Sequence, residues 1–218
     1  MTALLKKDFY VLKSTLLLYA GIITCLQLAP GNFILFSALY ASLLPASAFA
    51  YDDRSHWDEL AAMLPYSVRD IVLSRYITGW TAILFFNLIE LAVRMILQSV
   101  LPAYASGWNG FSHFAVQFIS LSAVAGSFLA VMLPLYFRFD SEKSRLIRAF
   151  LIALVCGAIA VIYMSAGTFA VVNGHTGSLD ENITVLLGMS APGLILVAAI
   201  LTAISIPLSI CAHRARHQ

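Results

Sequence analysis

The polar stretch Tyr51–Tyr76, YDDRSHWDELAAMLPYSVRDIVLSRY, interrupts a chain that is otherwise strongly apolar and holds five of its eleven acids. The whole chain has 218 residues, of which 61% are hydrophobic and 11% are charged, and its mean hydropathy is +0.88. In water-soluble domains the charged share is about a quarter, so this composition predicts an integral membrane protein. We therefore expect the stretch 51–76 to lie outside the hydrocarbon, where a soluble partner can bind it.

The apolar segments around this stretch are long enough to cross a membrane. A helix needs about 20 residues to cross roughly 30 Å of hydrocarbon, and that length predicts six spans in a single domain, 1–218. The expected fold is an all-α membrane protein with six transmembrane helices, an N-terminal amphipathic helix and a cytoplasmic insert at 51–76. The spans cover approximately residues 11–28, 33–50, 78–101, 114–136, 149–172 and 185–211.

The distribution of cations predicts the orientation in the membrane. Lys and Arg near the ends of spans are retained on the cytoplasmic side. Twelve of the thirteen cations lie at the N-terminus, in the stretch 51–76, in the link 138–148 and in the tail, and the thirteenth, Arg94, lies within a span. With an even number of spans, this pattern predicts a multi-pass protein of the cell membrane with both termini in the cytoplasm.

Residues 1–10 have the pattern of a short amphipathic helix that lies along the inner headgroups. The alternative is that its cations are only a basic flank that orients the first span. The apolar side of the helix would hold Leu4, Leu5 and Phe9, and the polar side Lys6, Lys7 and Asp8.

Two signals for helix N-termini lie within the stretch 51–76. Ser55-x-x-Asp58 and Ser67-x-x-Asp70 resemble the reciprocal cap, in which a serine and an acid three residues later satisfy free backbone amides. They predict a short helix over residues 56–64 and a second helix that continues into the third span. A proline separates the two helices, because it disfavours helix at the residue before it.

The first of these short helices is expected to be amphipathic. It could lie flat under the membrane and dock into a groove of a partner protein, and the alternative is an ordinary capped re-entry loop. Its apolar face would hold Trp57, Leu60, Ala61 and Leu64, with Asp58 and Glu59 toward water.

A polar stripe runs along the third span, where Asn87, Glu90, Arg94 and Gln98 recur at steps of three and four residues. At 1.5 Å per residue, Glu90 would lie roughly 18 Å and Arg94 roughly 24 Å from the inner end. A charge facing lipid there would cost on the order of 2.5–3.5 kcal/mol, so we expect both to face the bundle, a partner subunit or a wet cavity. The stripe is either a structural ion pair or a cavity-lining site, and Arg94 could instead reach the outer headgroups.

Sequence signals for other chemistry are weak. The five histidines form no His-Glu-x-x-His motif, and the sequence contains no Gly-x-x-x-x-Gly-Lys-Ser/Thr loop that would hold nucleotide phosphates. We therefore expect no enzymatic activity, no metal, no cofactor and no nucleic acid binding in this chain.

Three segments of the chain resemble the ABC type 2 permease family. This family consists of compact six-span membrane subunits of ATP-binding-cassette exporters, and includes permeases for phenol-soluble modulins and for bacteriocin self-immunity. The resemblance covers the whole chain in topology, and its specific motifs lie in the first 76 residues. The segments are Leu5-Lys6-Lys7-Asp8-Phe9, Trp57-x-x-x-x-x-x-Leu64-Pro65-x-Ser67 and Arg69-x-Ile71-Val72-x-Ser74-Arg75-Tyr76.

The resemblance implies roles for both cytoplasmic elements. The N-terminal helix would be an elbow helix, and the insert would supply the coupling helix that seats in a separate ABC ATPase, which would bind ATP and Mg²⁺. Two permeases, as a homodimer or a heterodimer, would enclose one path. The residues implied in coupling are His56, Trp57, Asp58, Glu59, Leu60, Leu64, Pro65, Ser67 and Arg69.

The expected function is therefore export of an amphipathic or hydrophobic cargo, either a peptide or a lipid-like molecule, in a role such as antimicrobial peptide export or immunity. The predicted walls of Leu, Phe, Tyr and Met favour such a cargo. A stand-alone six-span ligand-binding or immunity protein is the alternative, and a purely structural scaffold is a third. The capped insert favours the exporter, because six-span vitamin-binding subunits do not generally need one.

Overall fold

All elements in the described part of the chain are α-helices, so the all-α class is confirmed. The computed structural model describes residues 2–28, 34–55, 57–64, 66–100, 111–138 and 179–216. The helices are α1 (Thr2–Leu28), α2 (Ile34–Ser42), α3 (Leu44–Arg54), α4 (Trp57–Ala62), α5 (Val68–Val100), α6 (Phe111–Arg138) and α8 (Leu179–Arg216).

Four of these helices are long and apolar enough to cross a membrane. They are α1, α5, α6 and α8, which contain the first, fourth and sixth predicted spans and the described part, 78–100, of the third. The fifth predicted span, 149–172, lies outside the described residues. The candidate segments are Leu4–Cys25, Val68–Leu97, Ala115–Arg138 and Ala191–Ala215. Together with the apolar composition of the chain, these four segments identify it as a membrane protein.

The second predicted span, 33–50, is divided into two short helices, α2 and α3. Neither has the roughly 20 residues that a crossing needs. The division falls at Leu43, whose N–H donates to the Tyr40 carbonyl at 3.1 Å, and Pro45 follows in the first turn of α3. Proline has no N–H and clashes with the carbonyl of the fourth residue before it, which disfavours a continuous helix at this point; the first turn of a new helix, where Pro45 lies, tolerates it. Six crossings therefore stay a prediction.

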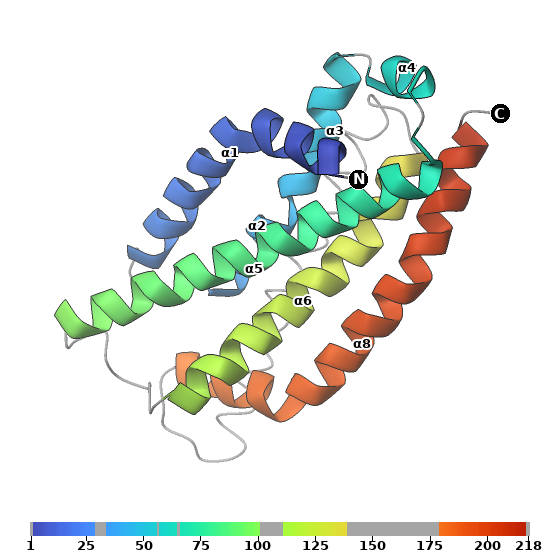
Figure 1. Cartoon of the computed structure of the whole chain (residues 1–218). Helices are drawn as coiled ribbons and strands as arrows, with labels where there is room; N and C mark the ends of the chain where they lie inside the picture. The colour runs from blue at the N-terminus through green and yellow to red at the C-terminus, as the bar shows by residue number, and fades with distance from the viewer. Residues whose placement is uncertain are drawn as a thin grey trace.

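The long helices lie side by side in an elongated bundle (Figure 1). α5 contacts α1, α2 and α6, and α6 also packs along α8. Both termini and α4 lie at the same end of the bundle, which we call the terminal end. α8 changes direction in its orange, N-terminal part, and Pro192 is the nearer to that part of the two prolines, Pro192 and Pro207, that lie inside the helix.

Helices α5 and α6 approach each other through two glycines. A Cβ atom added to Gly126 of α6 would lie 2.6 Å from Cζ2 of Trp80, and one added to Gly79 of α5 would lie 2.7 Å from Cδ2 of Leu129. Each glycine thus makes room for a large side chain of the other helix, as small residues do where membrane helices meet. This contact borders the main apolar core, which contains Leu129 at 1% exposure.

Candidate functional site

A cluster of buried charges joins α1, α3 and α5 at the terminal end. Arg75 of α5 is 4% exposed, and the two carboxylates that it binds, Asp8 of α1 and Asp52 of α3, are 3% and 8% exposed. Nη2 of Arg75 donates to Oδ2 of Asp52. Nη1 lies 3.0 Å from Oδ1 of Asp8, an ion pair whose geometry falls short of a hydrogen bond.

Lys7 completes this cluster and balances its charge. Its Nζ donates to Oδ1 of Asp52 at 2.6 Å and lies 3.7 Å from Oδ1 of Asp8. Two cations therefore face two acids, which offsets the large cost of moving charges out of water. We call Lys7, Asp8, Asp52 and Arg75 the charge cluster.

The charge cluster corrects the predicted sides of the N-terminal helix. Asp8 was expected on the polar side and Phe9 on the apolar side. Instead Leu4 and Asp8, one turn apart, are both 3% exposed, whereas Phe9 is 59% exposed. Asp8 faces inward because Arg75 and the Thr78 hydroxyl, whose Oγ1 lies 3.4 Å from Oδ2, compensate its charge there. α1 is also continuous from Thr2 into the first predicted span, with no separate short helix.

The charge cluster also shows that the stretch 51–76 lies only partly outside the bundle. Ser74, Arg75 and Tyr76 at its end are between 2% and 4% exposed. Arg75, which was counted among the cytoplasmic cations of the insert, is a buried partner of two acids. The side of the membrane on which it lies stays a prediction. The exposed part of the insert ends near the start of α5.

Helix α4 is attached to the charge cluster by Trp57. Nζ of Lys7 lies 3.8 Å from the centre of the Trp57 ring, a cation–π contact. Ala61, one turn later, is 8% exposed. One side of α4 therefore faces the protein, and the lysine that Trp57 contacts is the same one that binds Asp52.

The open side of α4, by which we mean its other side together with the turn that follows it, is apolar and exposed, with Leu60 51%, Met63 83% and Leu64 42% exposed. The single apolar face predicted for residues 56–64 is thus split. Leu60 is exposed although it lies within α4. For Leu64 the reason is length: α4 ends at Ala62, and the amides of Met63 and Leu64 bond only three residues back, to Leu60 and Ala61 at 3.1 and 3.2 Å. This tighter turn removes Leu64 from the helical pattern.

The two predicted caps have different outcomes. Ser67 caps α5: its Oγ accepts the Asp70 N–H at 3.1 Å and donates to the Asp70 carboxylate at 2.8 Å. Ser55, in contrast, ends α3, because its N–H donates to the Tyr51 carbonyl at 3.1 Å and its hydroxyl to the Asp52 carbonyl at 3.2 Å. The serine half of the second cap is confirmed, whereas the Asp70 carboxylate bonds to the Ser67 hydroxyl and not to a backbone amide. The first cap stays a prediction, because the Asp58 side chain lies outside the described part of the chain.

Several predicted coupling and stripe residues fall outside the described part of the chain. This holds for His56 and Pro65, and for the side chains of Asp58, Glu59 and Gln98. Arg69 is described and is exposed on the first turn of α5.

The polar stripe of α5 turns partly into the bundle. Asn87 and Glu90 are each 1% exposed, and Arg94 is half-buried. Nδ2 of Asn87 donates to the Ser122 hydroxyl of α6 at 3.0 Å. The inner part of the stripe therefore contacts a neighbouring helix.

A second polar contact, which the sequence did not suggest, holds α5, α6 and α8 together. The Tyr76 hydroxyl bonds to Ser205 and, at 2.9 Å, to Ser209 of α8. Ser205 in turn donates to the Ala130 carbonyl of α6. The only available signal was the four-residue spacing of the two serines, which places them on one helix face.

Metal-binding geometry is not present in the part of the chain that the structure describes, where no three His, Cys, Asp or Glu residues come close enough to share an ion.

A family model described as ABC-2 family transporter protein matches residues 3–212. This range includes the charge cluster, α4 and all four long apolar helices up to residue 212. No curated protein and no solved structure matches the chain significantly.

Proposed function

Since this chain belongs to the ABC-2 family of transporter proteins and is a membrane component of a transporter, we propose that it is the permease of an exporter powered by a separate ABC ATPase. The proposed cargo is amphipathic or hydrophobic, a peptide or a lipid-like molecule. The ATPase would bind ATP and Mg²⁺, and a homodimer or heterodimer of permeases would enclose the path. We place it in the cell membrane with both termini in the cytoplasm.

The observation that carries this proposal is the position of α4. The helix lies outside the bundle at the terminal end (Figure 1), held on one side through Trp57 and Ala61. On its other side Leu60 and Met63 are 51% and 83% exposed. A short helix that presents apolar side chains is suited to dock into the groove of a soluble partner. We propose that the ATPase binds this open side.

The charge cluster supports a route by which a movement of α4 would reach the bundle. Lys7 contacts the Trp57 ring and also binds Asp52, and Asp52 binds Arg75. A displacement of α4 would therefore act on α1, α3 and α5 together. The links between α1, α3 and α5 are buried or half-buried ion pairs, and breaking one of them would be costly, so these three helices are expected to move as one unit. The cation–π contact of Trp57 adds a weaker attachment of α4 to that unit.

For the polar stripe, the contacts favour a structural role in its inner part. Asn87 and Glu90 are buried, and Asn87 bonds to Ser122 of α6. We propose that this part fastens α5 to α6, and that Arg94, which is half-buried, lies nearer to the cargo path.

The test is to tag the C-terminal tail, purify the protein from its native host in mild detergent, and identify co-purifying proteins by mass spectrometry. The variant L60E/M63E places two acids on the open side of α4. It should reduce the recovered ABC ATPase by on the order of ten-fold or more, while the amount of permease in the membrane stays the same.

The matched control is S55E, which adds an acid to the same exposed stretch without changing the open side of α4; Ser55 is itself exposed. The S55E protein should retain the ATPase. Full recovery of the ATPase with L60E/M63E would refute the assignment of α4, and repeated purification of the unchanged protein without any ATPase would refute the exporter.

A further inference from the structure

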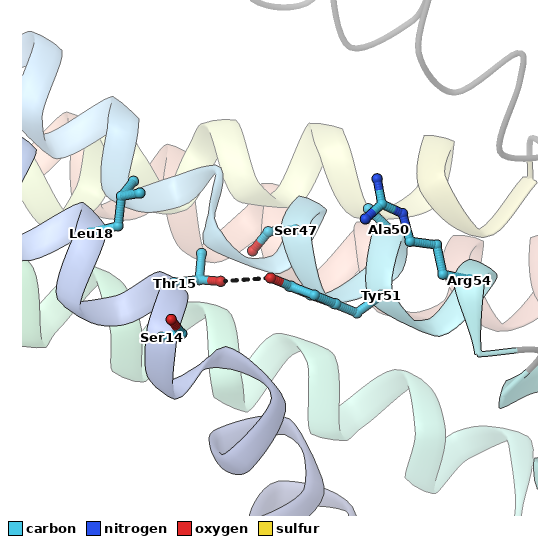
Figure 2. Close-up of a pocket in the computed structure, with 7 residues that line it drawn as sticks. All are labelled: Ser14, Thr15, Leu18, Ser47, Ala50, Tyr51 and Arg54. Carbon is cyan, nitrogen blue, oxygen red and sulfur yellow. Dashed lines mark hydrogen bonds between the residues drawn. The ribbon is translucent and has the colours of Figure 1, made fainter.

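A groove of about 370 Å³ lies between α1 and α3, close to the terminal end. Figure 2 shows that side chains of both helices line it and that Tyr51 reaches across it toward Thr15. The lining residues that matter for its chemistry are Ser14, Thr15 and Leu18 of α1, and Ser47, Tyr51 and Arg54 of α3.

The polarity of the groove changes from one end to the other. Arg54 and Leu18 lie at opposite ends, and the hydroxyls of Thr15 and Tyr51 meet between them at 3.4 Å (Figure 2). Next to Leu18, Leu17 is 72% exposed on a helix that is apolar enough to cross a membrane. A ligand that fills the groove would therefore meet a cation, then hydroxyls, then hydrocarbon.

The cationic end has hydrogen-bond donors available for a ligand. Arg54 is exposed, and no ion pair joins it to any of the residues that the structure describes. In contrast, Lys7 and Arg75 are both held by the acids of the charge cluster. None of the described lining residues is an acid. Arginine binds phosphate with two parallel hydrogen bonds, so a guanidinium that is paired with no described residue favours a phosphate group.

We propose that this groove binds an anionic phospholipid of the leaflet at the terminal end. Arg54 would bind the phosphate, the Thr15 and Tyr51 hydroxyls would bind the glycerol region, and an acyl chain would follow Leu18. The depth is suitable, because Leu18 belongs to the candidate span Leu4–Cys25 and Arg54 ends α3 at the terminal end. Anionic leaflets also attract basic residues at the surface.

Free phosphate could bind the same guanidinium, but it would gain nothing from Leu18. Binding of lipid in this groove needs neither an ATPase nor a cargo. Its failure and the failure of the proposed export function can therefore be told apart.

The test is native mass spectrometry of the full-length protein in detergent, titrated with phosphatidylglycerol, with phosphatidylcholine of the same acyl chains, and with inorganic phosphate. Phosphatidylglycerol should bind more tightly than the other two. R54Q should weaken this binding about five-fold, the effect of losing one arginine at an anionic surface, and Y51F should weaken it less.

The matched control is R214Q, which removes an exposed arginine from the last turns of α8 at the same end of the bundle. It should bind phosphatidylglycerol as the unchanged protein does. Equal affinity of R54Q and R214Q for phosphatidylglycerol would overturn the proposal. So would inorganic phosphate that binds as tightly as the lipid, since the groove would then be a simple anion site.

Discussion

Replacing Arg75 with methionine, which removes the charge and keeps much of the length, should destabilise the protein strongly. Arg75 is the buried cation between Asp8 and Asp52, and all three side chains are less than 10% exposed. Without it, two buried carboxylates would share the single charge of Lys7. That lysine is 20% exposed and reaches Asp52 at 2.6 Å but Asp8 only at 3.7 Å. Asp8 would therefore lose most of its compensation.

The size of the effect follows from this geometry. Removing one partner of a buried ion pair costs about 3–5 kcal/mol, because the other charge is left uncompensated. Lys7 remains beside Asp52, so we expect a cost for R75M near the lower end, about 3 kcal/mol. For a chain of this size that corresponds to a melting temperature lower by roughly 6–12 °C. The double variant D8N/R75M removes one charge of each sign and should recover about 2 kcal/mol of the sum of the single effects.

The assay is thermal unfolding of the purified protein in one detergent for the unchanged chain, D8N, R75M and the double variant. R69M is the matched control, because Arg69 is exposed on the same helix and surface substitutions usually change stability by less than about 0.5 kcal/mol. Two results would refute the idea that the charge cluster holds α1 to α5. One is an equal melting temperature for R75M and R69M, and the other is a loss of stability in D8N/R75M equal to the sum of the losses in D8N and R75M.

Two further predictions concern contacts between the long helices. G126A should lower stability by about 1–3 kcal/mol, because its Cβ would lie 2.6 Å from Cζ2 of Trp80 and force the two helices apart. G21A, whose Cβ would meet nothing within 4 Å, should unfold no earlier than the unchanged protein. Equal melting temperatures of the two variants would contradict the close approach. Y76F should cost about 1 kcal/mol, since it removes the hydroxyl bonded to Ser205 and Ser209. The control is Y10F, because the side chain of Tyr10 is 75% exposed. Equal melting temperatures for Y76F and Y10F would rule out a stabilising contact of the Tyr76 hydroxyl.

Features that depend on local sequence were predictable. Long apolar runs predict helices of membrane length, and four of the predicted spans coincide with such helices. The start of α5 was also predictable, because the serine at position 67 and the acid at position 70 bond to each other within one turn. Each of these signals is complete within a few consecutive residues.

The break between α2 and α3 was overlooked because hydropathy is averaged over about 20 residues. Pro45 hardly changes such an average, yet it has no N–H to donate and lies in the first turn of α3, directly after the break. The length of α4 was missed for a similar reason, since an apolar pattern does not record where the backbone tightens after Ala62.

The charge cluster could not be derived from periodicity. Its members bond across 23 and 45 residues of sequence, and a helical pattern reports only neighbours three or four positions apart. The resemblance had already singled out segments that contain Lys7, Asp8 and Arg75. It did not indicate that these residues contact one another.

The long sequence separation within the charge cluster has a consequence for biosynthesis. Thr78, which bonds to Asp8, follows it by 70 residues, so at a synthesis rate of about 5–20 residues per second roughly 4–14 seconds separate the two. During this interval Asp8 has none of its α5 partners, and its carboxylate must stay hydrated at the membrane surface. Helix α1 therefore reaches its final position only after the start of α5 has left the ribosome.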